Sequence, residues 1–432
     1  MENNTLCNRH SLGVNNHTKM YVTYTRIYGW SDYGVESSYQ PGYRLENMMW
    51  MTLLVYDYII PGDIMKRKAI IFPYNAECAS LVRNRELLLN HEIVACVSPI
   101  GYGLQGKDAA YAYGGENTGI VISDKKISEI NFDDLLVCES SSDFDTFIMP
   151  QVKLAAECGK NVIFLYNISQ QQKKEAEETC KKKNVKCVVL TNRRMDTDKL
   201  FEHEIIPLSV PVVFVASVIE NTNKFDVQLG LRKFLQEEGY KVSQIGTKEY
   251  CELFGFHAIP EFMYANQLSE ADKIVWFNRI CKSIELQEKP DIFIIGVPGA
   301  TMVFNETITN NFGITAFEIA NAVRPDTAIM CVPYEGYDSG FLKMIQTSSK
   351  YKLDMQVDCF NMANKHFDVA RSKEEKKLSF ITTGADLVDK RIEDLKRDTE
   401  IPIYNSLNVT SALEMYSYIV NKLSESDFGT VS

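Results

Sequence analysis

Short apolar runs alternate with amphipathic stretches from residue 66 to about residue 200. The apolar runs, typical of buried strands, are AIIFPY (69–74), EIVACVSP (92–99), LLVCES (135–140), NVIFLYN (161–167) and VKCVVLTN (185–192). Stretches with helical spacing lie between them, at 77–90, 144–158 and 169–183. This alternation predicts a parallel sheet with helices on its faces. Because such crossovers are right-handed, residues 65–204 are expected to form a Rossmann-like α/β domain.

The same alternation begins again after residue 205. Further strand patterns are VPVVFVASV (210–218), KVSQIGT (241–247), PDIFIIGVPG (290–299), PDTAIMCVPY (325–334), LSFITTG (378–384) and IPIYN (401–405). Helical patterns lie at 225–239, 270–287, 311–323, 385–397 and 409–424. Residues 205–432 are therefore expected to form a second α/β domain. The predicted fold class is two mainly parallel, three-layer α/β domains, the first Rossmann-like and the second like a degenerate P-loop NTPase.

Residues 1–64 differ from the rest of the chain in composition. They hold eight of the 22 tyrosines and two of the three tryptophans, with few regular periodic elements. One interpretation is an upstream extension, with the natural start at Met65. The other is a genuine aromatic-rich N-terminal arm that packs on the body or on a partner.

Charge and cysteine usage narrow the class of protein. Lys and Arg number 46 against 57 Asp and Glu, a net charge of −11, and no long basic stripe is present, which argues against a nucleic-acid partner. The longest apolar run, 48–60, is short for a membrane span and contains Asp57. The N-terminus lacks the basic and apolar regions of a signal peptide. The 11 Cys lack CxxC spacing, and the six His lack metal-ligand spacing, so we expect a reducing cytoplasm and no built-in metal site.

The stretch 212–235 has the layout of a phosphate-binding loop: a buried strand, a loop, a lysine and then a helix. The ideal pattern is GxxxxGK[ST], but Val218 and Asn223 occupy the glycine positions and Phe225 replaces the hydroxyl that would hold magnesium. Lys224 is retained at the start of the helix, where an anion is favoured. No acidic residue ends the strand FIIGVPGA (293–300), which argues against efficient NTP hydrolysis.

Two interpretations of this loop stay open. It could still bind a phosphate group without hydrolysis, or it could only shape the edge of the sheet. The residues expected at a degenerate phosphate or nucleotide site are Asn221, Asn223, Lys224, Gly246, Thr247 and Gly299.

A second candidate is the Gly-rich loop 100–119. Long loops in compact domains are often functional, and ligands of doubly wound sheets bind beyond the strand C-termini. We therefore expect an interdomain cleft lined by Lys107, Asp108, Gly114, Gly115, Glu116, Asn117 and Glu335. The alternative is a structured turn that faces solvent. His257 and His366 are isolated histidines, more typical of packed residues than of bases, and catalytic residues stay unassigned.

Several segments carry a resemblance to a known family. They are KRKAIIFPYN, VSPIGYGLQGKDAAYAYGGENTGI, NTNKFDVQLGLRKFLQEEGYKVSQIGTKEYCELFGFHAIP, PDIFIIGVPGATMVFN and NFGITAFEIANAVRPDTAIM. Over residues 66–425 the chain resembles bacterial peptide maturation system proteins, found beside radical-SAM enzymes that modify ribosomally made peptides. This resemblance implies a cytoplasmic role in peptide maturation, with a precursor peptide or a radical-SAM maturase as partner.

A more distant similarity is to two-domain proteins with a Rossmann-like front half and a P-loop back half, some of which are linked to acyl transfer onto amino acids. It implies a nucleotide or CoA as the ligand, although this chain departs from the intact Gly-rich loop of that group. Two hypotheses follow. The first is an accessory protein that binds precursor peptide or maturase. The alternative is a nucleotide- or CoA-dependent group-transfer enzyme acting on a peptide or amino acid. A homo-oligomer is left open.

Overall fold

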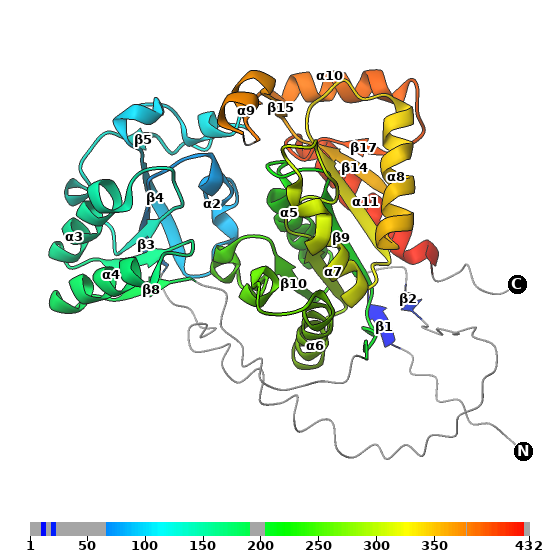
Figure 1. Ribbon diagram of the computed structural model, residues 1–432, viewed down its shortest axis with the longest axis horizontal. Coiled ribbons are helices and arrows are strands. Elements are labelled where there is room, and N and C mark those ends of the chain that lie inside the picture. Colours follow the sequence, from blue (N-terminus) through cyan, green and yellow to red (C-terminus); the bar gives the residue numbers. More distant parts are fainter. Residues whose placement is uncertain (1–9, 14–18, 23–65, 191–203, 377, 427–432) are drawn as a thin grey trace, which may run out of the picture.

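The computed structural model describes residues 10–13, 19–22, 66–190, 204–376 and 378–426. Near the N-terminus, β1 (His10–Gly13) and β2 (Lys19–Val22) pair as an antiparallel hairpin. The other residues of the predicted extension, 1–64, lie outside the described part of the chain. Figure 1 shows the remaining chain as two α/β units, one coloured blue to teal and the other green to red.

The first unit contains a six-stranded sheet in which every neighbouring pair of strands is parallel. Its strands are β3 (Arg67–Phe72), β4 (His91–Val97), β5 (Ile122–Ser123), β6 (Asp134–Val137), β7 (Asn161–Phe164) and β8 (Cys187–Val189). Their spatial order is β5-β4-β3-β6-β7-β8. This is the strand order of a dinucleotide-binding Rossmann sheet, which confirms the predicted Rossmann-like fold. The short strand β5, which follows the Gly-rich loop, was missed by the hydrophobic pattern.

Only one face of this sheet carries long helices of its own unit. Helices α3 (Met149–Glu157) and α4 (Gln170–Lys182) pack on it through a common apolar cluster. The helix expected over 77–90 is broken: α2 covers only Ala79–Arg83, between two short 3₁₀ segments. The side chain of Asn84 donates to the carbonyl of Ser80 and so competes with the helical hydrogen bonding.

The second unit contains a seven-stranded sheet, again parallel throughout. Its strands are β9 (Val212–Ser217), β10 (Val242–Gly246), β11 (His257–Ala258), β12 (Ile292–Gly296), β13 (Thr327–Val332), β14 (Cys359–Met362) and β17 (Ile403–Tyr404). The spatial order is β11-β10-β12-β9-β13-β14-β17, so the strand that precedes the degenerate phosphate loop, β9, lies at the centre.

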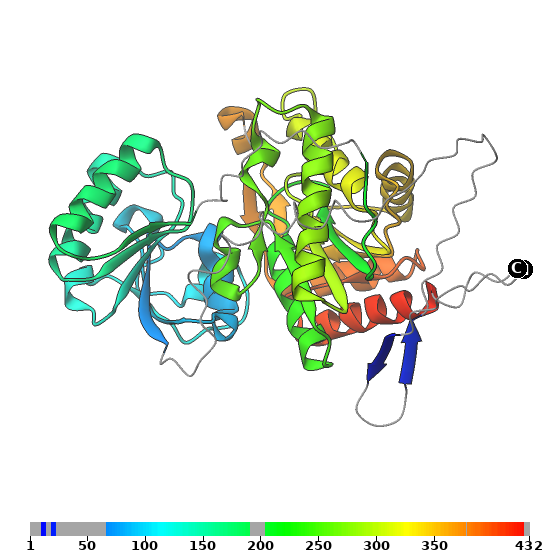
Figure 2. The same ribbon diagram turned by 90° about the horizontal axis from the view of Figure 1, so that it is seen from below.

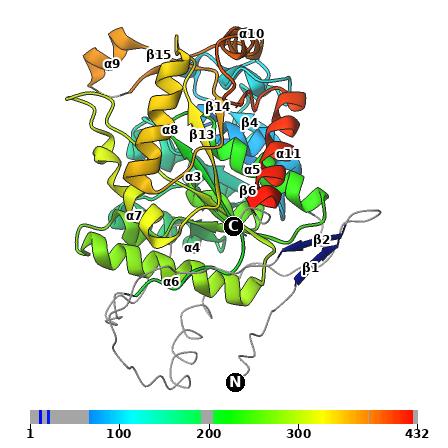
Figure 3. The same ribbon diagram turned by 90° about the vertical axis from the view of Figure 1, so that its right-hand side faces the viewer.

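Helices cover both faces of the second sheet. One face packs against α5 (Lys224–Glu237) and α11 (Val409–Ser426). The other packs against α6 (Glu270–Glu288), α7 (Ile314–Ala322), α8 (Ser339–Leu353) and α10 (Ala385–Lys396). Figure 3 shows α8 and α11 on opposite sides of β13 and β14. The predicted α/β class, with two mainly parallel sheets, is thereby confirmed.

One predicted strand does not join the second sheet. The segment LSFITTG forms β16 (Phe380–Thr382), which pairs antiparallel with β15 (Lys365–Phe367) in a separate hairpin around α9 (Val369–Glu375). The rings of Phe367 and Phe380 lie opposite each other across this hairpin, with centroids 6.1 Å apart. The periodic pattern correctly predicted an extended segment. That segment pairs with β15, which ends only 13 residues before it, and not with a strand of the seven-stranded sheet.

The second face of the Rossmann-like sheet is covered largely by the other unit. A single buried cluster, here called the shared core, contains residues of β3, β4 and α2 from the first unit. The second unit contributes Phe225, Leu229, Tyr250, Cys251, Phe254 and Phe256, from α5 and from the segment around η7 (Glu249–Phe254). Figure 2 shows these green elements lying against the blue ones. The two units therefore bury one continuous apolar core.

A buried carboxylate ties four strands together at the amino edge of the first sheet. Asp134 on β6 accepts hydrogen bonds from Arg67 on β3 (2.6 and 2.7 Å) and from Asn161 on β7 (2.8 Å). The Nε2 atom of His91 on β4 lies 3.2 Å from the same carboxylate. Burial alone would raise the pKa of Asp134, but these hydrogen bonds outweigh it and hold the pKa well below its usual range.

We expect Asp134→Asn to destabilise the chain by about 2–3 kcal/mol near pH 7, because Arg67 and His91 lose a buried partner. Since the folded-state pKa is depressed, the stability from Asp134 is fully present above pH 4 and is lost as the pH falls below that value. The difference between wild type and variant in urea unfolding should therefore be constant above about pH 4 and shrink as the pH falls from about 4 to about 2. Asp133→Asn, at an exposed neighbouring position, is the control. A difference independent of pH would contradict this account.

Candidate functional site

The degenerate phosphate loop, Val218–Asn223, connects the central strand β9 to α5. Asn221 and Asn223 both adopt the left-handed conformation, with φ of 59° and 56°. Asparagine tolerates this region better than most residues, so the chain keeps a tight turn without the two expected glycines. Position 223, where the ideal phosphate loop has a glycine, therefore keeps a backbone conformation typical of glycine.

Lys224 points from the first turn of α5 to the loop after β12. Its ammonium group donates to the carbonyls of Val297 (2.6 Å) and Gly299 (2.8 Å). Burial lowers the pKa of Lys224 to about 8. The Gly299 carbonyl also accepts from Ser217 at the end of β9 (3.2 Å), which fastens the two loops to each other. An ammonium group has three N–H donors, so two serve this fastening and a third is left over.

Phe225 lies in the shared core at the position where a P-loop protein carries its magnesium-binding hydroxyl. Its ring centroid is 5.5 Å from that of Tyr250 and 6.0 Å from that of Phe254. At the end of β10, a Cβ added to Gly246 would lie 2.6 Å from the Cys251 sulfur and 2.7 Å from the Phe256 ring. Gly246 is thus needed for this aromatic packing, in addition to its predicted place beside the loop.

The residues that flank Lys224 and Phe225 connect α5 to the first unit, Asn223 through Asn364 and Asp226 directly. The Asn223 side chain donates to Asn364 (3.1 Å), which in turn donates to the carbonyl of Tyr113 (2.7 Å). The Asp226 carboxylate accepts from Asn84 (3.0 Å) and forms an ion pair with Arg83 (3.1 Å). Each of the four consecutive side chains 223–226 therefore holds a neighbouring loop or the other domain.

Thr247 completes the predicted loop site. Its hydroxyl accepts from Gln228 (3.4 Å), whose amide also donates to the carbonyl of Lys224 (3.2 Å). Gln228 is fully buried against Gly296, where an added Cβ would lie 2.2 Å from the Gln228 oxygen. The structure thus brings Asn223, Lys224, Thr247 and Gly299 into one neighbourhood, while Asn221 projects from the exposed part of the loop.

The Gly-rich loop of the first unit is held mainly by its own side chains. The Asp108 carboxylate accepts from the backbone of Ala110, Thr118 and Gly119 and from the Thr118 hydroxyl. Burial raises its pKa, yet these hydrogen bonds leave the pKa below its usual value. The Lys107 ammonium lies 3.6 Å from the centre of the Tyr111 ring.

Of the predicted residues in this loop, Gly114 touches the second domain. It has a φ of 75°, and an added Cβ would lie 2.8 Å from the Asn364 amide and 2.9 Å from Thr382. Gly115 packs under the Tyr113 ring, and Glu116 and Asn117 are exposed. The loop therefore reaches the junction of the domains through Gly114.

Glu335 lies after β13 and contacts the β15–β16 hairpin. Its carboxylate accepts from the backbone N–H of Phe367 (2.8 Å) and lies 3.2 Å from Nδ1 of His366. The other histidine considered from the sequence, His257, lies 2.6 Å from the Glu288 carboxylate at the end of α6. Both histidines have acidic partners, and they belong to different places in the fold.

The sequence pattern gave no signal for five residues at the junction. They are Arg83, Tyr113, Asp226, Asn364 and Lys365. The contacts at the junction join distant positions: Asn223 and Asn364 are 141 residues apart, Asn84 and Asp226 are 142 apart, and Tyr113 and Asn364 are 251 apart. Side chains that far apart carry no shared spacing that a sequence motif could reveal.

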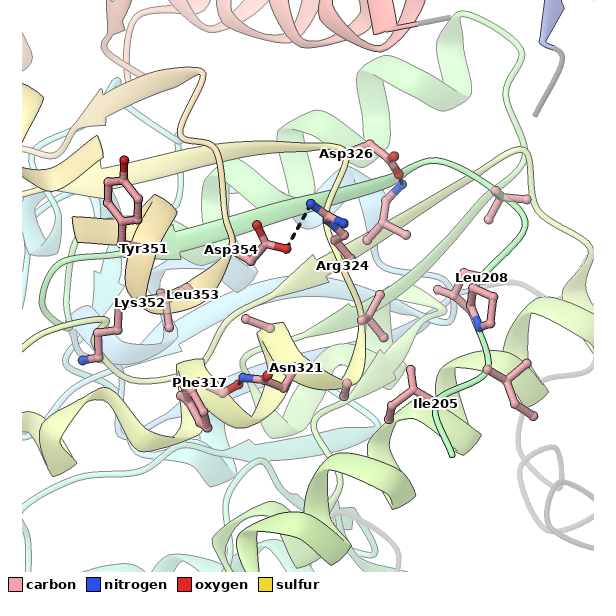
Figure 4. A pocket seen from close by; sticks show the side chains of 17 residues that line it. Ile205, Leu208, Phe317, Asn321, Arg324, Asp326, Tyr351, Lys352, Leu353 and Asp354 are labelled. Atoms are coloured by element: carbon pink, nitrogen blue, oxygen red, sulfur yellow. Dashed lines mark hydrogen bonds and ion pairs between the residues drawn. The ribbon is translucent and has the colours of Figure 1, made fainter. Parts of the chain in front are cut away.

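A large cavity of about 630 Å³ lies at the opposite, amino edge of the second sheet. Figure 4 shows its lining side chains, with Phe317 from α7 and Tyr351 from α8 at its rim. Three charged residues belong to its lining: Arg324 and Asp354 form an exposed ion pair at 3.0 Å, and Asp326 accepts from the backbone N–H of Val212 (2.8 Å). Apolar residues make up most of this lining, but polar groups supply more of its exposed surface, and the cavity is separate from the loop around Lys224.

Within the described ranges, the ten cysteines are all free and no group of three or more His, Cys, Asp and Glu side chains is arranged to hold a metal ion. Among the helices described, none has the length and apolar character needed to cross a membrane.

The sequence matches no protein-family model and no curated protein. Among solved structures, a DUF1611 family protein from Anabaena variabilis is similar over both units, with a TM-score of 0.56 and 11% identity, covering 82% of this chain and 100% of that chain. A GTPase from Pyrococcus abyssi matches with 13% identity and a TM-score of 0.27, over 52% of this chain and 99% of its own. Cobyrinic acid a,c-diamide synthase from Mycobacterium smegmatis, solved with bound ADP and magnesium, matches with 11% identity and a TM-score of 0.31, over 50% and 96%.

At such identities these likenesses concern the fold alone. The first confirms that the combination of both units is a known architecture, as the distant similarity implied. None of these three structures is described as a peptide maturation protein, so the resemblance to that family stays a prediction.

We expect Phe225→Ala to lower the free energy of unfolding by about 3–5 kcal/mol, because a large buried ring is removed from the shared core. Since that core spans both units, amide hydrogen exchange should accelerate at residues 78–88 of the first unit as well as in α5. Leu231→Ala is the matched control, because Leu231 is fully buried on the face of α5 that packs on its own sheet. Exchange at residues 78–88 that is unchanged in Phe225→Ala would contradict the shared core.

Lys224 should also change how the free energy of unfolding depends on pH in the alkaline range. Its pKa of about 8 in the folded chain lies below the ordinary 10.5, so between pH 8 and pH 10.5 the unfolded chain holds a proton that the folded chain lacks. Stability contributed through this group therefore rises with pH across that window. The stability difference between wild type and Lys224→Met should increase over it, whereas Lys233→Met, at a half-exposed surface position, should give a flat difference.

Proposed function

We propose that this protein is an accessory protein of peptide maturation, which binds a precursor peptide or its modifying enzyme and does not hydrolyse nucleotides. The observation that carries this proposal is the use made of the first turn of α5. Side chains 223–226, which would bind nucleotide and magnesium in an intact phosphate loop, hold neighbouring loops and the other domain. Phe225 offers no oxygen to magnesium.

The cavity at the amino edge of the second sheet supports a peptide as the bound partner. Its volume of about 630 Å³ is in the range of sites that enclose several apolar groups. The aromatic side chains Phe317 and Tyr351 are 43% and 83% exposed at its rim, so they are available to an incoming side chain. The resemblance to peptide maturation proteins supplies the class of peptide, a ribosomally made precursor.

The second candidate function is a nucleotide- or CoA-dependent group transfer. One observation favours it: Lys224 retains a donor beyond the two that its carbonyl partners use, at a helix N-terminus with left-handed residues beside it. In that case Asn221, Asn223, Lys224 and Gly299 would contact the phosphate groups of the ligand.

Thermal stability and peptide binding separate the two candidates. We expect ATP, GTP, CoA and acetyl-CoA, with or without magnesium, to leave the melting temperature of wild type and Lys224→Ala unchanged. A fluorescently labelled, ribosomally made precursor peptide should bind wild type in an anisotropy titration and bind Tyr351→Ala about tenfold more weakly, since an aromatic contact that forms on binding is lost. Tyr111→Ala, an exposed tyrosine on the first unit, is the control.

Stabilisation by a nucleotide or by CoA would contradict the accessory role. A nucleotide or CoA at 100 times its dissociation constant stabilises the folded state by about 2.7 kcal/mol. Such a shift in wild type that disappears in Lys224→Ala, together with no peptide binding, would replace the accessory role with the group-transfer role.

A further inference from the structure

Two free cysteines of the first unit face each other, Cys180 near the end of α4 and Cys187 at the start of β8. Side chains along a strand alternate between the two faces of its sheet. Cys187 and Val189 pack in the apolar cluster that α3 and α4 cover, whereas Val188 packs on the opposite face. Cys180 belongs to the same cluster as Cys187 and is fully buried. Both thiols therefore lie between α4 and the sheet.

The backbone brings the two residues together over a short loop. The carbonyl of Cys180 accepts from the backbone N–H groups of Lys183 (3.0 Å) and Val185 (3.1 Å), so the chain turns back directly after Cys180. Cys187 then pairs with Val162 on β7 in the parallel sheet. Only six residues separate the two cysteines, and the turn returns β8 beneath the helix that carries Cys180.

The two thiols also interact directly. The Cys187 thiol donates a hydrogen bond to the Cys180 sulfur, which lowers the pKa of Cys180 although burial acts in the opposite direction. The same hydrogen bond raises the pKa of Cys187, because it holds that proton in place. In such a pair one proton is lost more readily than from an isolated buried thiol. The thiolate formed in this way is the nucleophilic state of cysteine.

Cys187 gives the pair access to solvent. It is partly exposed on β8, the last strand at this edge of the six-stranded sheet. Two neighbouring charged side chains act on its pKa in opposite directions, Glu177 and Lys173, and they form an ion pair with each other (3.9 Å). The partner thiol, and not a neighbouring ion, therefore governs the acidity of this pair.

A second pair of thiols shows that closeness alone does not make cysteines reactive. Cys78 and Cys138 are also joined by a hydrogen bond, but they are only 1% and 2% exposed and lie in the shared core. Burial raises the pKa of Cys138, and the Cys78 thiol also donates to the carbonyl of Asn75 (3.4 Å). This pair is closed to solvent and disfavours a thiolate, so it is a matched comparison within the same unit.

We propose that Cys180 and Cys187 are a site of reversible oxidation, at which a peroxide converts the two thiols to a disulfide. The proton of the pair can reside on Cys180, which leaves the thiolate on Cys187. That thiolate attacks one oxygen of hydrogen peroxide, the O–O bond breaks, and Cys187 becomes a sulfenic acid as hydroxide leaves and takes up a proton. Cys180 then attacks the Cys187 sulfur, the S–S bond forms, the S–O bond breaks and water leaves. Two thiols lose two protons and two electrons, and the peroxide is reduced to two molecules of water.

The disulfide would fasten α4 to the edge strand β8. It closes a short loop at the last strand of the first unit, before the chain passes to the second unit. A disulfide with one partly exposed sulfur is open to attack by thiols, so a dithiol reductant reverses the modification. The proposal goes beyond the accessory role and does not depend on peptide binding.

The test is peptide mapping of the full chain after treatment with increasing hydrogen peroxide, followed by denaturation and alkylation of the remaining thiols. A peptide linked through Cys180 and Cys187 should appear in wild type and disappear after dithiothreitol. Cys78 and Cys138 should stay alkylatable over the same range. The proposal is overturned if Cys180 and Cys187 both stay reduced at a peroxide concentration that oxidises the exposed, isolated Cys158. It is also overturned if the Cys78–Cys138 disulfide forms first.

Serine variants separate the two steps. Cys180→Ser should leave a sulfenic acid on Cys187 that dimedone traps, whereas Cys187→Ser should leave the buried Cys180 reduced. Cys78→Ser, the matched control, should form the Cys180–Cys187 disulfide as wild type does. Amide hydrogen exchange in α4 should slow on oxidation of wild type and stay unchanged in Cys180→Ser. A dimedone adduct on Cys187 of wild type without any disulfide would overturn the proposal, because Cys180 would then be out of reach.

Discussion

The structure depends on a shortage of helices on one face of the Rossmann-like sheet. A parallel sheet must bury both faces, because its strands are apolar on both sides. Helices α3 and α4 cover one face, but on the other α2 spans only Ala79–Arg83. Apolar side chains of the second domain, with Phe225 among them, fill the remaining space. The two domains are therefore joined by a core that neither completes alone.

This constraint accounts for the state of the phosphate loop. In an intact loop the residue after the lysine must carry a hydroxyl for magnesium, whereas here it must be large and apolar to fill the shared core. The two requirements cannot be met by one side chain. Lys224 also has a structural role, since its ammonium joins the start of α5 to the loop after β12. The Ser217 hydroxyl joins the same loop to the end of β9. Loss of the glycine at position 223 is tolerated because Asn223 adopts the left-handed conformation.

Polar groups at the junction divide into two kinds. Asn364 is fully buried and satisfied, with hydrogen bonds to Tyr113 and Thr383 and from Asn223, and so fixes the orientation of the domains. Arg83 is charged and partly buried: it forms an ion pair with Asp226 and covers the Tyr113 ring, while its Nε and Nη1 atoms make no hydrogen bond. A satisfied network such as that of Asn364 confers specificity of packing, and the ion pair of Arg83 with Asp226 adds a charged contact between the domains.

The sequence by itself determined the α/β class and the position of ten of the thirteen strands of the two sheets, because strand burial and helical amphipathicity are local properties with periods of two and 3.6 residues. It missed β5, β11 and β14. It also located the loop around Lys224, since the order of strand, loop, lysine and helix is local too. It did not reveal that LSFITTG pairs in a hairpin, nor that α2 is short. Only the tertiary structure decided that Phe225 completes the other domain, that Asp226 meets Arg83 and that Asn364 meets Tyr113. Those contacts join positions more than a hundred residues apart, and they arise from the summed packing of two surfaces instead of any spacing along the chain.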